Sequence, residues 1–90
     1  MTIQHQFEQF DRENPHVYDK LVGLAIEWLD QNASVGMKML WERLRWEFGV
    51  QTTEEAPRLN NNYTSRYARK LLADFPEWGG RIKTRELQAA

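Results

Sequence analysis

The sequence predicts one small, mainly α-helical domain that ends in a short β-strand. Three segments repeat apolar residues at three- and four-residue spacing, which is the period of one helix face. A fourth segment, 81–87, begins by alternating basic and uncharged side chains, as an edge strand does. A chain of 90 residues suits one domain and is short for an enzyme with a deep pocket.

The composition is that of a soluble globular protein, with 41% hydrophobic and 28% charged residues. Eleven aromatic residues give a small core its bulk. The absence of cysteine excludes disulfides and thiolate metal sites, and it is typical of a reducing cytosol. The first ten residues lack the pattern of a secretory signal, and no segment approaches the roughly 20 apolar residues of a membrane span. We therefore expect a cytoplasmic protein.

The net charge of −1 is unevenly distributed along the chain. Residues 1–34 hold six acidic and two basic residues, whereas residues 35–90 hold ten basic and seven acidic ones. An asymmetry of this kind can create a local binding face on a protein whose total charge is near zero.

The N-terminal part predicts an arm or short helix over 1–13, followed by a long helix. Phe7 and Phe10 lie three residues apart, and Asn14-Pro15 is typical of a cap and a first helical position. The long helix is expected to reach Gln31, with one apolar face. That face comprises Tyr18, Leu21, Val22, Ala25, Trp28 and Leu29, and it is widened by Val17, Leu24 and Ile26.

A second helix is predicted over 37–48 and a third from the asparagine run to Phe75. The second has Met37, Leu40, Trp41, Leu44 and Phe48 on one side, Lys38, Glu42, Arg43 and Arg45 outside, and Gly49 as its expected end. A connection of about ten residues follows, with an extended piece expected at 50–52. The third helix is expected to be capped by one of the asparagines or by Thr64. Its apolar positions are Tyr63, Tyr67, Ala68, Leu71, Leu72 and Phe75.

The order of three helices and a basic strand is the outline of a winged helix-turn-helix, with a turn at 76–80 before the β wing. We expect such a three-helix domain over 14–87 and a tail at 88–90. The connection from Gly49 to Asn61 exceeds the three or four residues of the simplest helix-turn-helix, although winged members have longer ones.

The front of the third helix carries the side chains that reading a DNA groove requires. Asparagine matches the edge of adenine and arginine that of guanine, while hydroxyls and helix N-termini bind phosphate. The residues expected to face bases and adjoining phosphates are Asn60, Asn61, Asn62, Thr64, Ser65 and Arg66. Those expected to neutralise backbone are Arg69, Lys70, Arg81, Lys83 and Arg85. The sequence thus predicts a non-catalytic protein that binds double-stranded DNA.

The residues assigned to DNA contact also have purely structural interpretations. Asparagines before a helix are common caps, surface arginines are often solvated, and charged residues protect strand edges. Tyr63 and Tyr67 suit the core better than base stacking, and stacking on single strands would require one of them to be exposed.

A protein-interaction module is the alternative function, with contacts from the acidic segment 8–30 and from tryptophans. Two or more tryptophans exposed in one patch would favour it, and burial of all four would favour DNA.

Catalysis, metal binding and cofactor binding are not expected. His5 and His16 lie eleven residues apart without a metal-binding spacing, and Gly79-Gly80 suits a turn rather than a phosphate loop. The carboxylate pair Glu54-Glu55 consists of sequence neighbours, which point apart on a helix.

The strings LWERLRWEF, LNNNYTSRYARKLL and TREL resemble a family of small uncharacterised phage and bacterial proteins with an LNNNYTSRYAR motif. The resemblance covers about residues 7–87, and NNNYTSRYAR is its most specific part. It implies a winged-helix fold and a phage or mobile-element setting, and it implies no particular activity.

Overall fold

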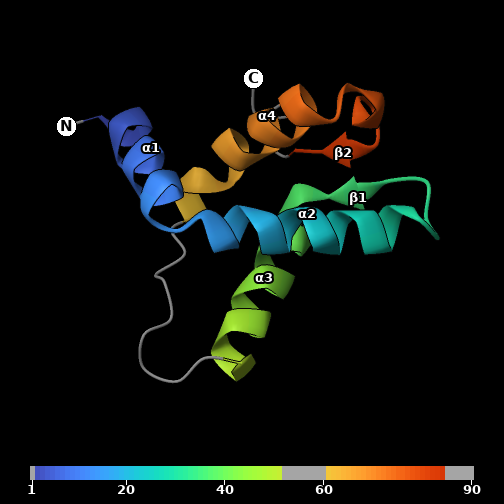
Figure 1. Cartoon of the computed structure of the whole chain (residues 1–90). Coiled ribbons are helices and arrows are strands. Elements are labelled where there is room, and N and C mark those ends of the chain that lie inside the picture. Colours follow the sequence, from blue (N-terminus) through green and yellow to red (C-terminus); the bar gives the residue numbers. More distant parts are fainter. Residues whose placement is uncertain (1, 52–60, 85–90) are drawn as a thin grey trace.

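The protein is mainly helical, with one small two-stranded parallel sheet (Figure 1). The structure is a computed structural model that describes residues 2–51 and 61–84, without the side chains of 49–51 and 61. Its elements are α1 (Ile3–Glu13), α2 (Pro15–Leu29), β1 (Val35–Gly36), α3 (Met37–Gln51), η1 (Asn61–Tyr63), α4 (Thr64–Asp74), η2 (Pro76–Trp78) and β2 (Ile82–Lys83). The expectations for Asn60, Arg85 and the tail at 88–90 lie outside the described residues.

The N-terminal segment is a helix that belongs to the core. Thr2 Oγ1 accepts a hydrogen bond of 3.1 Å from the His5 N–H and caps α1. Phe7 is buried, and its ring meets the ring of Tyr67 edge-on at 4.8 Å. Phe10 packs against Tyr63 at 5.2 Å. Aromatic contacts therefore join α1 to the start of α4, far away in the sequence.

Helix α2 begins as predicted, with Pro15 in its first turn, but it ends at Leu29, two residues before the expected Gln31. Asn14 occupies the cap position without capping through its side chain, and its Nδ2 donates instead to the Phe10 carbonyl at 3.1 Å. The amide thereby closes the end of α1. Five residues of the expected apolar face are buried: Val17, Leu21, Leu24, Ala25 and Leu29.

Helix α3 places all five of its predicted core residues in the interior. Its expected end at Gly49 is wrong, because the helix continues to Gln51, and 50–51 are therefore not extended. Glycine ends a helix where it adopts the left-handed conformation, whereas inside a helix it costs only about 1 kcal/mol relative to alanine. Packing of Leu44 and Phe48 against the core can offset a cost of that size.

Helix α4 also packs the predicted face, with Tyr63, Tyr67, Ala68 and Leu71 buried. Its cap differs from the prediction: the 3-10 turn η1 leads into the helix, and the cap residue is Tyr63, which makes no side-chain cap bond. Asn61 and Asn62 therefore belong to the helical path instead of preceding it.

The basic strand β2 pairs with β1 in parallel, in the register Val35↔Ile82 and Gly36↔Lys83 (Figure 1). Within residues 2–51 and 61–84, its partner thus comes from the connection between α2 and α3 rather than from a wing hairpin. The expected turn at 76–80 contains η2, which buries Trp78 with its ring stacked on Phe75 at 4.3 Å.

Candidate nucleic-acid interface

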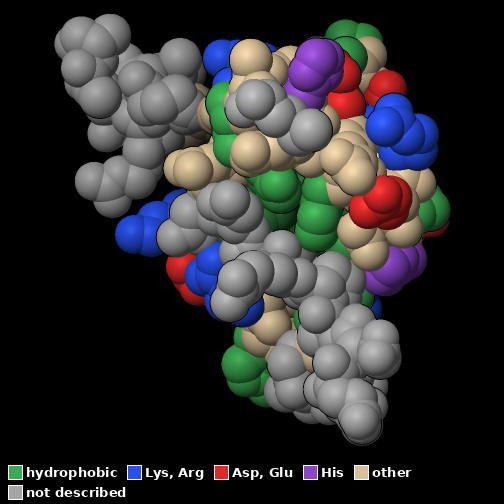
Figure 2. All heavy atoms as spheres, turned by 90° about the vertical axis from the view of Figure 1, so that its left-hand side faces the viewer, with side chains coloured by type: hydrophobic (Ala, Val, Ile, Leu, Met, Phe, Trp, Pro, Cys, Tyr) green, Lys and Arg blue, Asp and Glu red, His purple; other side chains and the backbone are tan. Residues whose placement is uncertain are grey.

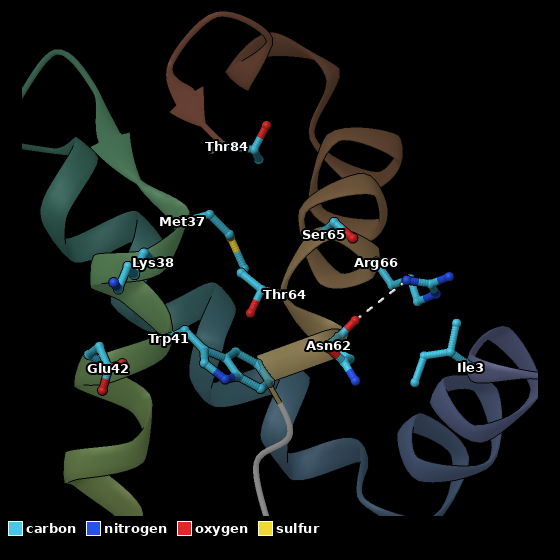
Figure 3. Close-up of a pocket in the computed structure, with 10 residues that line it drawn as sticks. All are labelled: Ile3, Met37, Lys38, Trp41, Glu42, Asn62, Thr64, Ser65, Arg66 and Thr84. Atoms are coloured by element: carbon cyan, nitrogen blue, oxygen red, sulfur yellow. Dashed lines mark hydrogen bonds between the residues drawn. The ribbon is translucent and has the colours of Figure 1, made fainter. Parts of the chain in front are cut away.

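A groove of about 550 Å³ lies between the starts of α3 and α4 (Figure 3). Ile3 of α1 and the buried side chains of Met37 and Trp41 form its apolar lining. Its uncharged polar and basic lining residues are Lys38, Asn62, Thr64, Ser65, Arg66 and Thr84. Four of the side chains predicted to contact DNA therefore share one concave surface with residues from three other parts of the chain.

Arg66 crosses from α4 towards α1. Its Nε donates to Gln4 Oε1 at 3.1 Å, and its Nη1 donates to the Asn62 carbonyl at 3.4 Å. Both acceptors are uncharged, so within residues 2–51 and 61–84 no carboxylate pairs directly with this positive charge. Gln4 also contacts a carboxylate, since its Nε2 donates to Glu8 at 3.0 Å. Arg66 is therefore oriented by the protein and still able to attract an anion.

Ser65 and Arg69 lie on the same side of α4 as Arg66, at a spacing of four residues or fewer. Ser65 is half-buried and Arg69 is exposed. Arg69 makes no ion pair within the described part of the chain. Asn62 is also exposed, and Asn61 belongs to η1. The front of α4 thus presents amide, hydroxyl and guanidinium groups outward.

Lys70, which the sequence predicts to contact the DNA backbone, is bound within the protein. Its Nζ forms an ion pair with Asp11 of α1 and lies 4.3 Å from the centre of the Tyr18 ring. Helix α1 brings Asp11 to Lys70 of α4 from 59 residues away in the sequence. The ammonium group is already occupied by a carboxylate and an aromatic face.

Two tyrosines surround this ion pair. The Tyr18 hydroxyl donates to Asp74 Oδ2 at 2.5 Å, and burial together with the Asp74 carboxylate raises the pKa of Tyr18. Burial, followed by the charge of Asp11, raises the pKa of Tyr67. Both phenols therefore stay neutral at pH 7.

Arg81, which the sequence predicts to contact the DNA backbone from a wing, is also bound within the protein. Its Nη2 donates to the carbonyls of Leu29 at 2.8 Å and Asn32 at 3.0 Å, and its Nε donates to the Ala33 carbonyl at 2.9 Å. These acceptors lie at and just after the C-terminal end of α2, where carbonyls lack helical partners. Arg81 closes that end and is withdrawn from the proposed interface. Lys83 is exposed, and Thr84 carries the chain to the groove.

The aromatic residues separate into buried and exposed ones. Trp41 and Trp78 are buried, whereas Trp28 is 40% and Trp46 58% exposed, on α2 and α3 respectively. Tyr63 and Tyr67 are buried and therefore cannot serve as platforms for stacking the bases of a single strand.

The face of the molecule seen in Figure 2 does not carry one continuous basic field. On the face that Figure 2 shows, Lys and Arg side chains occur singly or next to carboxylates. On this face, binding of nucleic acid would depend on a local set of side chains and not on a broad basic surface.

Sequence reasoning identified the α4 side of the groove but assigned no function to Lys38, Trp41 or Thr84. Of these three residues, Lys38 alone could have been noticed in the sequence. A basic residue in the first turn of a helix is not stabilised by the helix dipole, so its presence there calls for another explanation. Trp41 and Thr84 reach the groove through tertiary packing, which the local pattern does not encode.

Comparison of the chain with protein families, curated proteins and solved structures found no match. Among the described residues, no cluster of three or more potential metal ligands is present, and no helix has the length and apolar character required to span a bilayer.

Proposed function

We propose that this protein is a non-catalytic, double-stranded-DNA-binding regulator of transcription or replication, in a phage or bacterial setting. The observation that carries the proposal is the outward face of α4, where Arg66 and Arg69 lack carboxylate partners among the described residues. Arginine suits the guanine edge, and the neighbouring Ser65 hydroxyl suits phosphate. Asn62, at the same end, offers the amide that matches adenine.

The order α2–β1–α3–α4–β2 supports a winged-helix arrangement in which α4 would enter the major groove. Lys83 on β2 would then contact backbone beside it. Lys70 and Arg81 are excluded because their cationic groups are bound within the protein. Asn60, Asn61 and Arg85 keep the roles that the sequence suggests.

Titration of duplex DNA at two salt concentrations tests the proposal. Binding should weaken as salt rises, because each neutralised phosphate releases counterions. Arg69→Gln should lower affinity about tenfold and reduce the salt slope by about 1. The matched control is Arg12→Gln, since Arg12 is exposed at the other end of α1 from the groove, about 12 Å along the helix axis from Gln4. No detectable binding at low salt, or equal affinities for the two variants, would refute the proposal.

A second candidate, binding of a protein partner, is favoured by the exposed side of α3. Met39 and Trp46, seven residues apart and thus on one helix face, are 41% and 58% exposed. Arg43 lies between them, with its guanidinium 5.1 Å from the Trp46 ring centre. This function predicts that Trp46→Ser abolishes partner binding and leaves DNA affinity unchanged. If Trp46→Ser loses DNA binding while Arg69→Gln keeps it, the protein partner and DNA do not bind to α3 and α4 respectively.

A further inference from the structure

We propose that α1 is an autoinhibitory helix, whose acidic side holds the cations on one flank of α4 and so restrains their binding to DNA phosphate. The inference rests on the proposed function, because it concerns the same helix α4. It also gives a role to the acidic N-terminal part of the chain, which the proposed DNA contacts leave without one.

The two helices carry opposite charge and lie against each other. Helix α1 has three acidic residues and one basic residue, whereas α4 has three basic residues and one acidic residue. Phe7 of α1 is buried, and its ring contacts the rings of Tyr63 at 5.9 Å and Tyr67 at 4.8 Å. These contacts fix α1 against the start of α4 (Figure 1). The acidic side chains of α1 are thereby held within reach of α4.

Lys70 is the cation of α4 that α1 binds most directly. Its Nζ forms an ion pair with Asp11, and the side chains of Lys70 and Asp11 are 34% and 18% exposed. A partly buried ion pair is screened by salt much less than a pair on the open surface. A DNA phosphate must displace the Asp11 carboxylate to reach this ammonium group, so Asp11 competes with DNA for the same charge.

Arg66 is held on the same flank of α4, one helical turn before Lys70. Its guanidinium extends from α4 towards the helix that carries Ile3 (Figure 3), and its Nε donates to Gln4 Oε1 at 3.1 Å. Gln4 in turn donates through Nε2 to Glu8 at 3.0 Å, which links a second carboxylate of α1 to this cation through one amide. A phosphate that approaches this flank therefore meets the field of two carboxylates.

Arg69 lies outside this contact with α1. It directly precedes Lys70 in the sequence and therefore points about 100° away from it around the helix. Arg69 is exposed and forms no ion pair in the part of the chain that the structure describes. Helix α4 thus offers one cation to DNA and keeps two on the side that α1 covers. Binding through Arg69 should strengthen when α1 loses the carboxylate that holds Lys70.

Titration of duplex DNA with matched variants of α1 tests the restraint. Asp11→Asn removes the charge that holds Lys70 and keeps the shape of the side chain. It should raise duplex affinity about fivefold and steepen the salt slope by about 1, because one more cation can neutralise a phosphate. Its control is Glu13→Gln, which removes the same charge from the opposite side of α1, about 200° around the helix. Glu13 is exposed and accepts from Gln9 of its own helix at 3.2 Å, so this change should alter affinity by no more than about twofold.

A second pair of variants tests the other contact. Gln4→Glu places a carboxylate against the Arg66 guanidinium and should lower duplex affinity at least about threefold. Gln6→Glu is the control, because it adds the same charge at an exposed position on the opposite side of α1. Far-UV circular dichroism checks that each variant is folded, and if Asp11→Asn is not, the second pair decides the test.

The titration separates failure of the restraint from failure of the proposed function. If duplex binds and the two members of either pair have equal affinities, the restraint is overturned and the proposed function stands. If no duplex binds to the unmodified protein or to any variant, the proposed function is refuted and the restraint with it.

Discussion

Replacing Arg81 by alanine should destabilise the fold, because this side chain closes the end of α2. It donates three hydrogen bonds of 2.8–3.0 Å to backbone carbonyls of residues 29, 32 and 33. A hydrogen bond to a charged group contributes about 1.5–3 kcal/mol when shielded from water. Only the bond to Leu29 is partly buried, so we assign it about 1.5 kcal/mol and each exposed bond about 0.5 kcal/mol. The expected loss is therefore about 2.5 kcal/mol.

Urea unfolding followed by tryptophan fluorescence measures this loss directly. A change of about 2.5 kcal/mol corresponds to a fall in Tm of about 10–20 °C for a domain of this size. Arg81→Lys should restore less than half of the stability, because an ammonium group cannot reach three carbonyls from one position. Lys83→Ala, on the same strand but exposed, is the control and should change stability by no more than about 0.5 kcal/mol. If Arg81→Ala matches that control, the structural role assigned to Arg81 is refuted.

Three further changes probe the core, the tyrosines and a turn. Leu44→Ala, at a fully buried site, should lower the free energy of unfolding by about 3 kcal/mol. Met39→Ala, at an exposed site, is the control and should lower it by less than about 1 kcal/mol, as measured by chemical denaturation. The raised pKa of Tyr67 means that the folded state holds its proton more tightly, so its contribution is complete below about pH 10 and declines as pH rises further. Tyr67→Phe should reduce the loss of stability between pH 9 and 11 and have little effect at pH 7, as urea midpoints at each pH would show. Gly80 has a φ of +85°, so Gly80→Ala should cost about 1–2 kcal/mol by thermal unfolding, and an unchanged Tm would contradict this expectation.

The sequence predicts the helices well because their apolar residues recur within one or two turns. The core faces of α3 and α4 follow directly from that spacing, as the burial of Leu44 and Tyr67 confirms. The sequence predicts poorly the roles of residues whose contacts lie far away along the chain. The roles of Lys70 and Arg81 are set by Asp11 and by the end of α2, both about 50 or more residues away.

The groove was predictable only in part, for the same reason. The amide, hydroxyl and guanidinium groups at the front of α4 stand out as a local string. The meeting of Lys38 with that string depends on how α3 crosses α4, which no local period encodes.

The pairing of β1 with β2 has a consequence for how the protein is made. Among the described residues, Val35 pairs with Ile82 and the carbonyl of Leu29 accepts from Arg81, so the N-terminal helices emerge from the ribosome before the segment that completes them. A chain released before residue 81 would lack the strand that pairs with Val35 and the guanidinium that binds the carbonyls at the end of α2. We expect such fragments to be recognised by chaperones and proteases, because the small sheet and the end of α2 are complete only once residues 81–83 have been made.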